Sequence, residues 1–437
     1  MRMGETAELG SWATAAEAVE CFDGPAGAYV HVPFCERICP FCPYDKVRAE
    51  PRRARRYFAA LHREVAGYVA EREALGSGPF TSLYVGGGTP TLYPDELAEI
   101  IEQVPVLSEV AVEVLPNHAT AVQLDRLAGM GVTAVSIGAQ SFHDGVLWRL
   151  RRPHDAAAGR SAVERALGRF GCVDVDLIVD VAWEEPDAFL EDVRACFALG
   201  VDQVSTYPLM RFGYTPFGAT RHDGRREHIV LARAHALARA MGYERRSVWT
   251  FNRPGAPAFS SITRRRFLGM GASAASFAGR DFWVNHFGVA TYADLVERDR
   301  LPIARRLHLG RWAGAAYDVF WQAYAGGADR AALERSYGRA VAGTVGTVLG
   351  ASALAGLVRR VPDGHRLTDR GFDAYHDLER LVTYQLIEPL WAELLAERGD
   401  GDGDEGWAVP ERARAGRVWS LARWLFDRPP VTAGPRP

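Results

Sequence analysis

Hydrophobic and polar positions follow two different spacings along the first half of the chain. Between residues 26 and 250, short apolar runs rich in β-branched residues alternate with longer stretches of helical spacing. The expected strands are Ala28–Val32, Ser82–Val85, Val110–Val114, Ala134–Ile137, Asp174–Val179, Gln203–Tyr207 and Tyr243–Ser247. The expected helices include Arg52–Glu71, Pro94–Glu102, Gln123–Met130, Gly159–Gly168 and Pro186–Leu199. This alternation predicts an α/β fold, a parallel sheet wrapped by helices as a full or partial (β/α) barrel.

The second half changes pattern and becomes mostly helical and amphipathic from about residue 310. The expected organisation is an N-terminal extension (1–23), the barrel (24–250), a connecting Gly-rich segment (251–309), a helical C-terminal domain (310–398) and an acidic linker with the C-terminal tail (399–437). In barrels of this class the chemistry lies at the carboxyl ends of the strands. Residues that follow the expected strands are therefore the first candidates for a site.

Composition narrows the class of protein. The 437 residues are 48% hydrophobic and 24% charged, with a net charge of −3, so we expect neither nucleic-acid nor anionic-membrane binding. No apolar run approaches the roughly 20 residues of a membrane helix. The first residues carry Glu5, Glu8, Glu17 and Glu20 and lack an apolar core, so they do not form a signal peptide. The segment Thr263–Ala275 imitates a twin-arginine export signal but lies deep inside the chain. We therefore expect a cytoplasmic protein.

Three cysteines follow the first expected strand with the spacing Cys-x3-Cys-x2-Cys: Cys35, Cys39 and Cys42. Three thiolates on one short loop can hold three irons of a four-iron, four-sulfur cluster, and the fourth iron then stays open to a small chelating molecule. A Cys3His zinc site with His31 is the alternative, although no second Cys or His pair follows at zinc-finger spacing. The other cysteines, Cys21, Cys172 and Cys196, are scattered and are most simply reduced thiols.

The run Tyr29-Val-His-Val-Pro-Phe-Cys-Glu-Arg-Ile-Cys-Pro-Phe-Cys-Pro-Tyr-Asp-Lys46 resembles the cluster loop of the oxygen-independent coproporphyrinogen III oxidase family, within the radical S-adenosylmethionine (SAM) enzymes. That family includes haem chaperones and class C methyltransferases and cyclopropanases. The resemblance implies a partial (β/α)6 barrel, possibly extended by a further strand, with a winged-helix-like C-terminal domain. It also implies a [4Fe–4S] cluster on the three cysteines, SAM, a small-molecule substrate, and an electron donor such as flavodoxin or ferredoxin.

Further blocks carry the same resemblance. Gly86-Gly-Gly-Thr-Pro90 lies one β/α unit after the cysteines, and glycines there let the backbone approach a ligand closely. Gly131–Phe142 and Leu150–His154 resemble the family's Gly-Val-x-Arg-Leu-Ser-x-Gly-x-Gln-Ser-Phe and Gly-Arg-x-His blocks. By match, the cofactor-binding residues are Tyr29, His31, Phe41, Gly87, Gly88, Thr89, Glu113, Gln140, Arg152 and Asp176, with Gly271 and Ala272 lining a second SAM or substrate site. His154 suits a role at a helix entry or in catalysis equally well.

The chain also departs from the family pattern. Asp180 and Ala182 replace the usual Gly and Pro, and Ser260–Phe267 lacks the His and the aromatic pair of a His-Asn-x-x-Tyr-Trp block. Tyr44 stands where the oxidases carry a fourth Cys, which disfavours coproporphyrinogen decarboxylation. The missing His disfavours haem chaperoning. The remaining branch, C-methylation or cyclopropanation with a second SAM, is therefore the expected reaction, and the two disfavoured functions stay as alternatives. No catalytic residue is assigned.

One acidic stretch imitates a calcium loop. Asp400-Gly-Asp-Gly-Asp404 starts like an EF-hand, and Glu411 falls at the twelfth position. Glu405 stands where the sharp turn requires Gly, and no helix–loop–helix pattern frames the stretch. A flexible acidic linker is the better interpretation.

Overall fold

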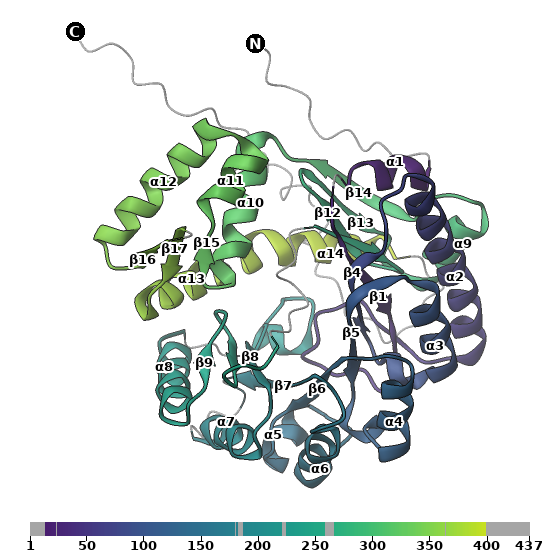
Figure 1. The fold of residues 1–437 in the computed structure, drawn as a ribbon. Coiled ribbons are helices and arrows are strands. Elements are labelled where there is room, and N and C mark those ends of the chain that lie inside the picture. Colours follow the sequence, from purple (N-terminus) through teal and green to yellow (C-terminus); the bar gives the residue numbers. More distant parts are fainter. Residues whose placement is uncertain are drawn as a thin grey trace.

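A computed structural model of the chain describes residues 14–22, 24–179, 181, 187–220, 224–257, 266–362 and 364–398. Its centre is a 12-stranded sheet in the order β14-β13-β12-β11-β1-β4-β5-β6-β7-β8-β10-β9 (Figure 1). The strands from β11 through β1 to β8 are parallel. The strands at both edges are antiparallel.

Six parallel strands alternate with helices as the sequence pattern predicts. The strands are β1 (Gly27–Val32), β4 (Phe80–Gly87), β5 (Val106–Val114), β6 (Ala134–Gln140), β7 (Cys172–Val179) and β8 (Gln203–Pro208). The helices are α2 (Pro51–Ala74), α3 (Pro94–Gln103), α4 (Ala121–Gly129), α5 (Asp144–Arg149), α6 (Ala156–Ala166), α7 (Ala188–Leu199) and α8 (Gly224–Ala240). Figure 1 shows these helices around the outside of the curved sheet. The predicted partial (β/α)6 barrel is confirmed.

Local signals explain where the helices begin and end. The Glu50 side chain accepts hydrogen bonds from the backbone N–H groups of Arg52 and Arg53, and Pro51 opens α2. The side chain of Asp155 caps α6 in the same way. At the other end of a unit, Gly200 stops α7 with φ of 77°, a conformation that suits Gly. Strand β7 is buried along almost its whole length, and its Val173, Val175, Leu177 and Val179 side chains pack in the main hydrophobic core.

The expected strand Tyr243–Ser247 is not a further parallel strand. Only β9 (Glu244–Arg245) forms there, and it pairs antiparallel with β10 (Thr250–Asn252). The chain reverses between them because the hydroxyls of Ser247 and Thr250 lie 2.7 Å apart and the Arg246 N–H donates to the Thr250 carbonyl. The extra parallel strand is β11 (Arg266–Met270), which lies beside β1.

Segment 251–309 extends the barrel sheet. It contains β11, then β12 (Ala275–Ala278), β13 (Asp281–Asn285), α9 (Val289–Glu297) and β14 (Ile303–His308). The N-terminal α1 (Ala15–Glu20) packs against α2. Two-residue strands β2 (Phe34–Cys35) and β3 (Val47–Arg48) bracket the cysteine loop. Short helical turns follow three of the barrel strands: η1 (Pro90–Leu92), η2 (Pro116–His118) and η3 (Pro216–Ala219).

The C-terminal domain is mostly helical, as expected, and stands beside the barrel (Figure 1). Its helices are α10 (Arg311–Tyr324), α11 (Arg330–Tyr337), α12 (Arg339–Leu354), α13 (Asp369–Val382), the π-helical turn η4 (Thr383–Ile387) and α14 (Glu388–Ala396). A small antiparallel sheet of β15 (Gly327–Ala328), β17 (Gly364–Leu367) and β16 (Val358–Val361) completes it. This arrangement matches the winged-helix-like expectation. Among the described residues, none of the helices has the length and apolar character needed to cross a membrane.

Candidate cluster and cofactor site

The cysteine loop is held in shape by its own backbone and by one lysine. Cys35 ends β2, and the Cys42 N–H donates to the Cys39 carbonyl at 3.3 Å. Lys46 is buried, and its Nζ donates to the carbonyls of Cys42 at 2.5 Å and Tyr44 at 2.8 Å. An ammonium bonded to two carbonyls pulls the loop into a fixed turn. The three thiols are therefore presented together at the carboxyl end of β1.

The thiols are partly exposed and free, and donors point at two of them. Arg152 Nη1 lies 3.3 Å from Cys39 Sγ, and the Thr89 hydroxyl lies 3.9 Å from Cys35 Sγ. Burial, together with Cys42 and Cys39, raises the pKa of Cys35 to about 12. Burial also raises the pKa of Cys42. A bound iron would reverse this preference for the protonated thiol, because a coordinating thiol is deprotonated outright. Donors around the sulfurs are one means by which a protein tunes an iron–sulfur cluster.

The donor set fits a cluster and does not fit the zinc alternative. Two sulfurs on one zinc lie at most about 4.6 Å apart, twice the Zn–S bond length. Within the described part of the chain, the three cysteine sulfurs are not all within 4.8 Å of one another. His31 also has no nitrogen to spare, because its Nε2 donates to the Asp45 carbonyl at 3.0 Å and its Nδ1 accepts from Tyr29 at 2.7 Å. This separation of the sulfur atoms suits a cluster, in which each thiol binds a different iron.

The glycine loop after β4 is built against the cysteine loop. The N–H groups of Gly88 and Thr89 donate to the carbonyls of Val32 and Phe34, at 2.8 and 2.7 Å. Gly87 has φ of +112°, and a Cβ there would approach the His31 ring to 2.5 Å. The loop therefore needs glycine at position 87 in order to lie this close to His31 on β1. The ammonium group of SAM can only donate hydrogen bonds. It would therefore need the carbonyls of this loop, rather than the N–H groups that already donate to Val32 and Phe34.

Two predicted carboxylates lie on the strands themselves, Glu113 on β5 and Asp176 on β7. Glu113 accepts from the Tyr84 hydroxyl at 2.6 Å and from the Gly87 N–H at 3.1 Å. Asp176 accepts from the Ser136 hydroxyl at 2.7 Å. Burial raises the pKa of Glu113, and burial with the nearby Asp174 raises the pKa of Asp176 well above its ordinary value. A cationic ligand beside these groups would favour their ionised forms and lower both pKa values.

Arg152 and Gln140 complete the same side. Arg152 Nη2 donates to the Gly138 carbonyl at 2.7 Å, whereas its buried Nε has no hydrogen-bond partner among the described residues. A planar guanidinium is suited to bind a carboxylate, as SAM offers. Gln140 ends β6 in a left-handed conformation with φ of 69°, which is uncommon for a non-glycine residue and often marks functional positions.

His154 has a structural environment. It is buried, and its Nε2 donates to the Ala139 carbonyl at 3.0 Å. Burial and the neighbouring Arg152 lower the pKa of His154 to about 4. These contacts hold the end of β6, and they favour the helix-entry interpretation over catalysis.

Gly271 and Ala272 form a tight turn whose polar groups are used inside the protein. The Gly271 N–H donates to Glu64 at 2.7 Å, and its carbonyl accepts from Asn285 at 2.9 Å. The Ala272 N–H donates to the Tyr57 hydroxyl at 3.1 Å. The structure thus joins this turn to α2, and a second SAM contact at these two residues stays a prediction.

Sequence reasoning missed several groups at the site. Tyr84 and Ser136 hold Glu113 and Asp176, and Lys46 shapes the cysteine loop. Tyr84 lies two residues before Gly86 on β4. Because side chains alternate between the two faces of a strand, this spacing would have placed Tyr84 on the same face of the sheet as Gly86. Phe41, which was predicted, packs with an apolar cluster around Leu150 and Ile178. Asp180, Ala182 and the stretch 400–411 lie outside the described residues.

Tyr44 replaces the oxidases' fourth cysteine and faces the same region. The pKa of Tyr44 is raised by the surrounding protein and further by Cys42, Glu113 and Asp176, yet 48% of its surface is exposed. The ring centroid lies 5.7 Å from that of Trp391 on α14.

Comparisons with known proteins agree with this geometry. The profile of the radical SAM superfamily matches residues 29–193. The haem chaperone HemW of Mycobacterium tuberculosis is 30% identical over 316 residues, which cover 68% of this chain and 80% of the relative. The chain belongs to the radical SAM superfamily, among the relatives of HemW and coproporphyrinogen III oxidase. HemW of Bacillus subtilis is 26% identical over 79% of this chain and 95% of its own length.

A comparison with solved structures shows the same fold. The solved structure of coproporphyrinogen III oxidase (HemN) from Escherichia coli superposes with a TM-score of 0.69 at 22% identity, covering 83% of this chain and 91% of that one. Further relatives are named oxygen-independent coproporphyrinogen III oxidase. Because these relatives are haem chaperones and oxidases, the comparisons give the expected methylation or cyclopropanation no specific support. They favour the two alternatives instead.

Proposed function

We propose that this radical SAM protein handles a tetrapyrrole, and that its primary role is haem binding and transfer of the HemW type. The observation that carries the proposal is the match to a haem chaperone over 95% of that relative's length. Tyr44 at the position of the oxidases' fourth cysteine supports the same choice, because it removes a feature of the decarboxylating branch. Haem and coproporphyrinogen share a flat, largely apolar macrocycle with carboxylate arms.

The mouth of the barrel offers a surface of matching chemistry. Tyr44 and Trp391 lie together, and the Trp391 ring is 5.9 Å from that of Phe212. Flat aromatic rings stack well on a flat macrocycle. Under this proposal the tetrapyrrole lies against Tyr44 and Trp391, next to the cysteine loop. A Trp391→Ala variant should then bind haem at least tenfold more weakly.

The chain keeps the groups that a SAM-cleaving protein needs. Cys35, Cys39 and Cys42 would hold the cluster, and the free Nε edge of Arg152 would bind the SAM carboxylate. The Glu113 carboxylate accepts from the Gly87 N–H of the glycine loop and would orient the bound cofactor there. When bound, the cluster and SAM supply a 5′-deoxyadenosyl radical upon one-electron reduction. This machinery favours oxidation of a coproporphyrinogen as the second candidate function.

One experiment separates the candidates. The protein is reconstituted anaerobically with iron and sulfide, given SAM and a chemical reductant, and assayed with haem or with coproporphyrinogen III. Stoichiometric haem binding without consumption of haem supports the chaperone, and loss of carbon dioxide from coproporphyrinogen supports the oxidase. Formation of S-adenosylhomocysteine would instead support methyl transfer. Absence of iron from the anaerobically reconstituted protein would contradict both candidates.

A further inference from the structure

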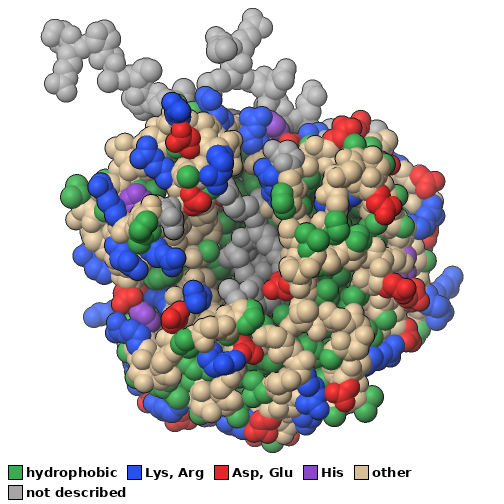
Figure 2. Space-filling view, viewed as in Figure 1, with side chains coloured by type: hydrophobic (Ala, Val, Ile, Leu, Met, Phe, Trp, Pro, Cys, Tyr) green, Lys and Arg blue, Asp and Glu red, His purple; other side chains and the backbone are tan. Residues whose placement is uncertain are grey.

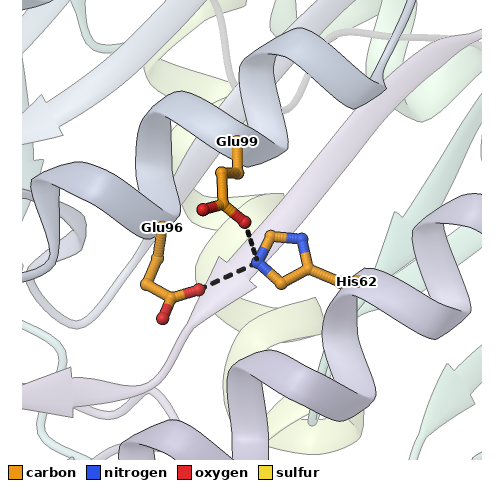
Figure 3. Close-up of side chains that lie close together, drawn as sticks. All are labelled: His62, Glu96 and Glu99. Atoms are coloured by element: carbon orange, nitrogen blue, oxygen red, sulfur yellow. Dashed lines mark hydrogen bonds and ion pairs between the residues drawn. The ribbon is translucent and has the colours of Figure 1, made fainter.

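A group of metal-ligating side chains lies between α2 and α3, on helices rather than on the strand ends that carry the cysteines (Figure 3). His62 comes from α2, and Glu96 and Glu99 come from α3. His62 Nε2 is 2.8 Å from Glu96 Oε2 and 3.6 Å from Glu99 Oε2. One ligand atom from each of the three residues lies within 4.8 Å of the other two. Figure 3 shows both carboxylates turned toward the same ring nitrogen.

The imidazole is oriented by a residue outside this triad. His62 Nδ1 lies 3.1 Å from the side-chain Oε1 of Gln103. A carbonyl oxygen can only accept, so Nδ1 carries a hydrogen and donates it. Nε2 lies within hydrogen-bond distance of Glu96, and without a proton it would offer its lone pair to a metal ion held between the two carboxylates. A metal-bound histidine usually donates its other ring N–H in this way.

Charge also points to a cation. Glu96 and Glu99 form their ion pairs with His62, and no Arg or Lys of the described residues pairs with either of them. Nearby arginines are engaged elsewhere: Arg63 with Asp299, and Arg126 with Asp95. Two carboxylates therefore face one imidazole. A proton on Nε2 could satisfy only the carboxylate at 2.8 Å, whereas a divalent ion could contact all three groups.

We propose that His62, Glu96 and Glu99 form a second metal site, separate from the cluster, that binds a divalent transition metal of the zinc type. Imidazole nitrogen and carboxylate oxygen are ordinary zinc ligands, with bonds of about 2.0–2.2 Å. The His62 side chain is only 17% exposed, so the ion would lie against the protein rather than in bulk solvent. Three protein ligands would leave a position for water.

The site joins two helices that follow the chemically important loops. α2 begins soon after the cysteine loop, and α3 begins soon after the glycine loop at Gly87–Thr89. A metal between the helices would fix their relative position. Because the loops are hydrogen-bonded to each other, this clamp would support the register of the cluster site from outside.

The test uses the full chain with its cluster loaded, so that the cysteines are occupied, and with loosely bound metal removed. Equilibrium dialysis against Zn²⁺ measures binding beyond the cluster iron, and X-ray absorption at the zinc edge identifies the ligand atoms. The expected result is one zinc per chain with a shell of nitrogen and oxygen. A shell of sulfur would place the zinc at cysteines and overturn the proposal.

Variants assign the site. His62→Ala and Glu99→Gln should each weaken zinc binding at least tenfold, and Gln103→Ala should weaken it about tenfold through the lost orientation of the ring. Glu102→Gln removes the same charge from an exposed position of α3 and should bind zinc as the wild type does. If the wild type takes up no zinc, or if His62→Ala binds it unchanged, the three side chains form an ion pair only and the proposal is wrong.

Discussion

Arg152 connects three parts of the site through one guanidinium. Nη1 reaches the Cys39 sulfur, Nη2 holds the Gly138 carbonyl, and Nε is buried without a partner in the described part of the chain. A lysine at this position would keep the positive charge but lose the planar fork. The positive charge and the planar hydrogen-bonding geometry of this side chain can therefore be tested separately.

Arg152→Lys is expected to weaken SAM binding about tenfold, equivalent to about 1.4 kcal/mol, while the iron content stays unchanged. The reason is that the three cysteines remain in place and only the fork for the SAM carboxylate is lost. Anaerobic titration calorimetry with SAM and an iron assay measure the two effects. The neighbouring Arg151, exposed on the same turn, provides the control Arg151→Lys, which should bind SAM normally. Equal SAM affinity in Arg152→Lys would contradict the assignment.

Glu64 is a buried carboxyl whose titration bears on stability. Burial raises its pKa from 4.5 to about 7, although Tyr292, Gly271 and Asn285 donate hydrogen bonds to it. The folded state therefore binds the proton more tightly than the unfolded state. Its contribution to stability is greatest below pH 4.5 and is lost as the pH rises to about 7.

Glu64→Gln should remove this pH dependence, which is worth up to about 3 kcal/mol at about 1.36 kcal/mol for each pKa unit. Urea unfolding at about pH 5 and about pH 8 gives the change in free energy for wild type and variant. The wild type should lose more stability across this range than Glu64→Gln does. Glu73→Gln, at an exposed position of the same helix, should behave like the wild type. Identical pH slopes for wild type and Glu64→Gln would show that the carboxyl is ionised in the fold.

At the scale of elements, α13 is joined to the barrel by a buried chain of hydrogen bonds. Trp249 Nε1 donates to His376 Nδ1 at 3.1 Å, so the His376 hydrogen is on Nε2, which donates to Glu227 at 2.8 Å. The side chains of His376 and Glu227 are each 1% exposed. Removal of one partner leaves the other buried without its bond.

His376→Ala is expected to lower the free energy of unfolding by about 1–3 kcal/mol, the usual cost of leaving a buried donor such as Trp249 Nε1 without its acceptor. Because the lost bond joins α13 to α8, limited proteolysis should also cut the C-terminal domain faster. His228, which pairs with Asp377 nearer the surface, gives the control His228→Ala, with an expected loss below about 1 kcal/mol. Wild-type stability in His376→Ala would show that the bond chain does not hold the domain.

The sequence pattern predicted the elements better than their partners. The six barrel strands and the cysteine loop follow from local apolar runs and spacing, which the sequence displays directly. The hairpin β9–β10 and the parallel strand β11 could not be predicted, because their pairing depends on which strand end lies free in the finished sheet. For the same reason Glu113 was predicted but its partner Tyr84 was not, since that contact joins neighbouring strands. Nothing in the sequence indicated that the Gly271 N–H donates to the Glu64 carboxylate.

For the whole molecule, the C-terminal domain covers the region around the cysteine loop. Arg398 Nη1 lies 3.3 Å from Asp45 Oδ1, and the Asp45 side chain is inaccessible. The Tyr384 hydroxyl accepts from the Arg211 N–H, and Arg305 on β14 pairs with Glu393. Figure 2, in the same view as Figure 1, shows arginine side chains over the outer face of this domain. These polar contacts act beside an apolar cluster in which Trp391, Leu394 and Leu395 of α14 pack with Phe212 and Tyr214.

Arg398→Ala should make the cluster several-fold more sensitive to air, because Asp45 loses its ion pair and the cysteine loop loosens. The decay of the cluster's visible absorbance after exposure to oxygen measures this. Arg339→Ala, whose side chain is 93% exposed on α12, is the matched control and should decay like the wild type. An unchanged rate in Arg398→Ala would mean that the loop is held without its C-terminal partner.

The pairing of Asp45 with Arg398 also constrains the order of biogenesis. Arg398 follows α14 in the sequence, so the cysteine loop gains this contact only after α14 has been synthesised. Iron and sulfide delivery should therefore precede the docking of α14, and a ribosome stalled before Arg398 should still permit metal loading.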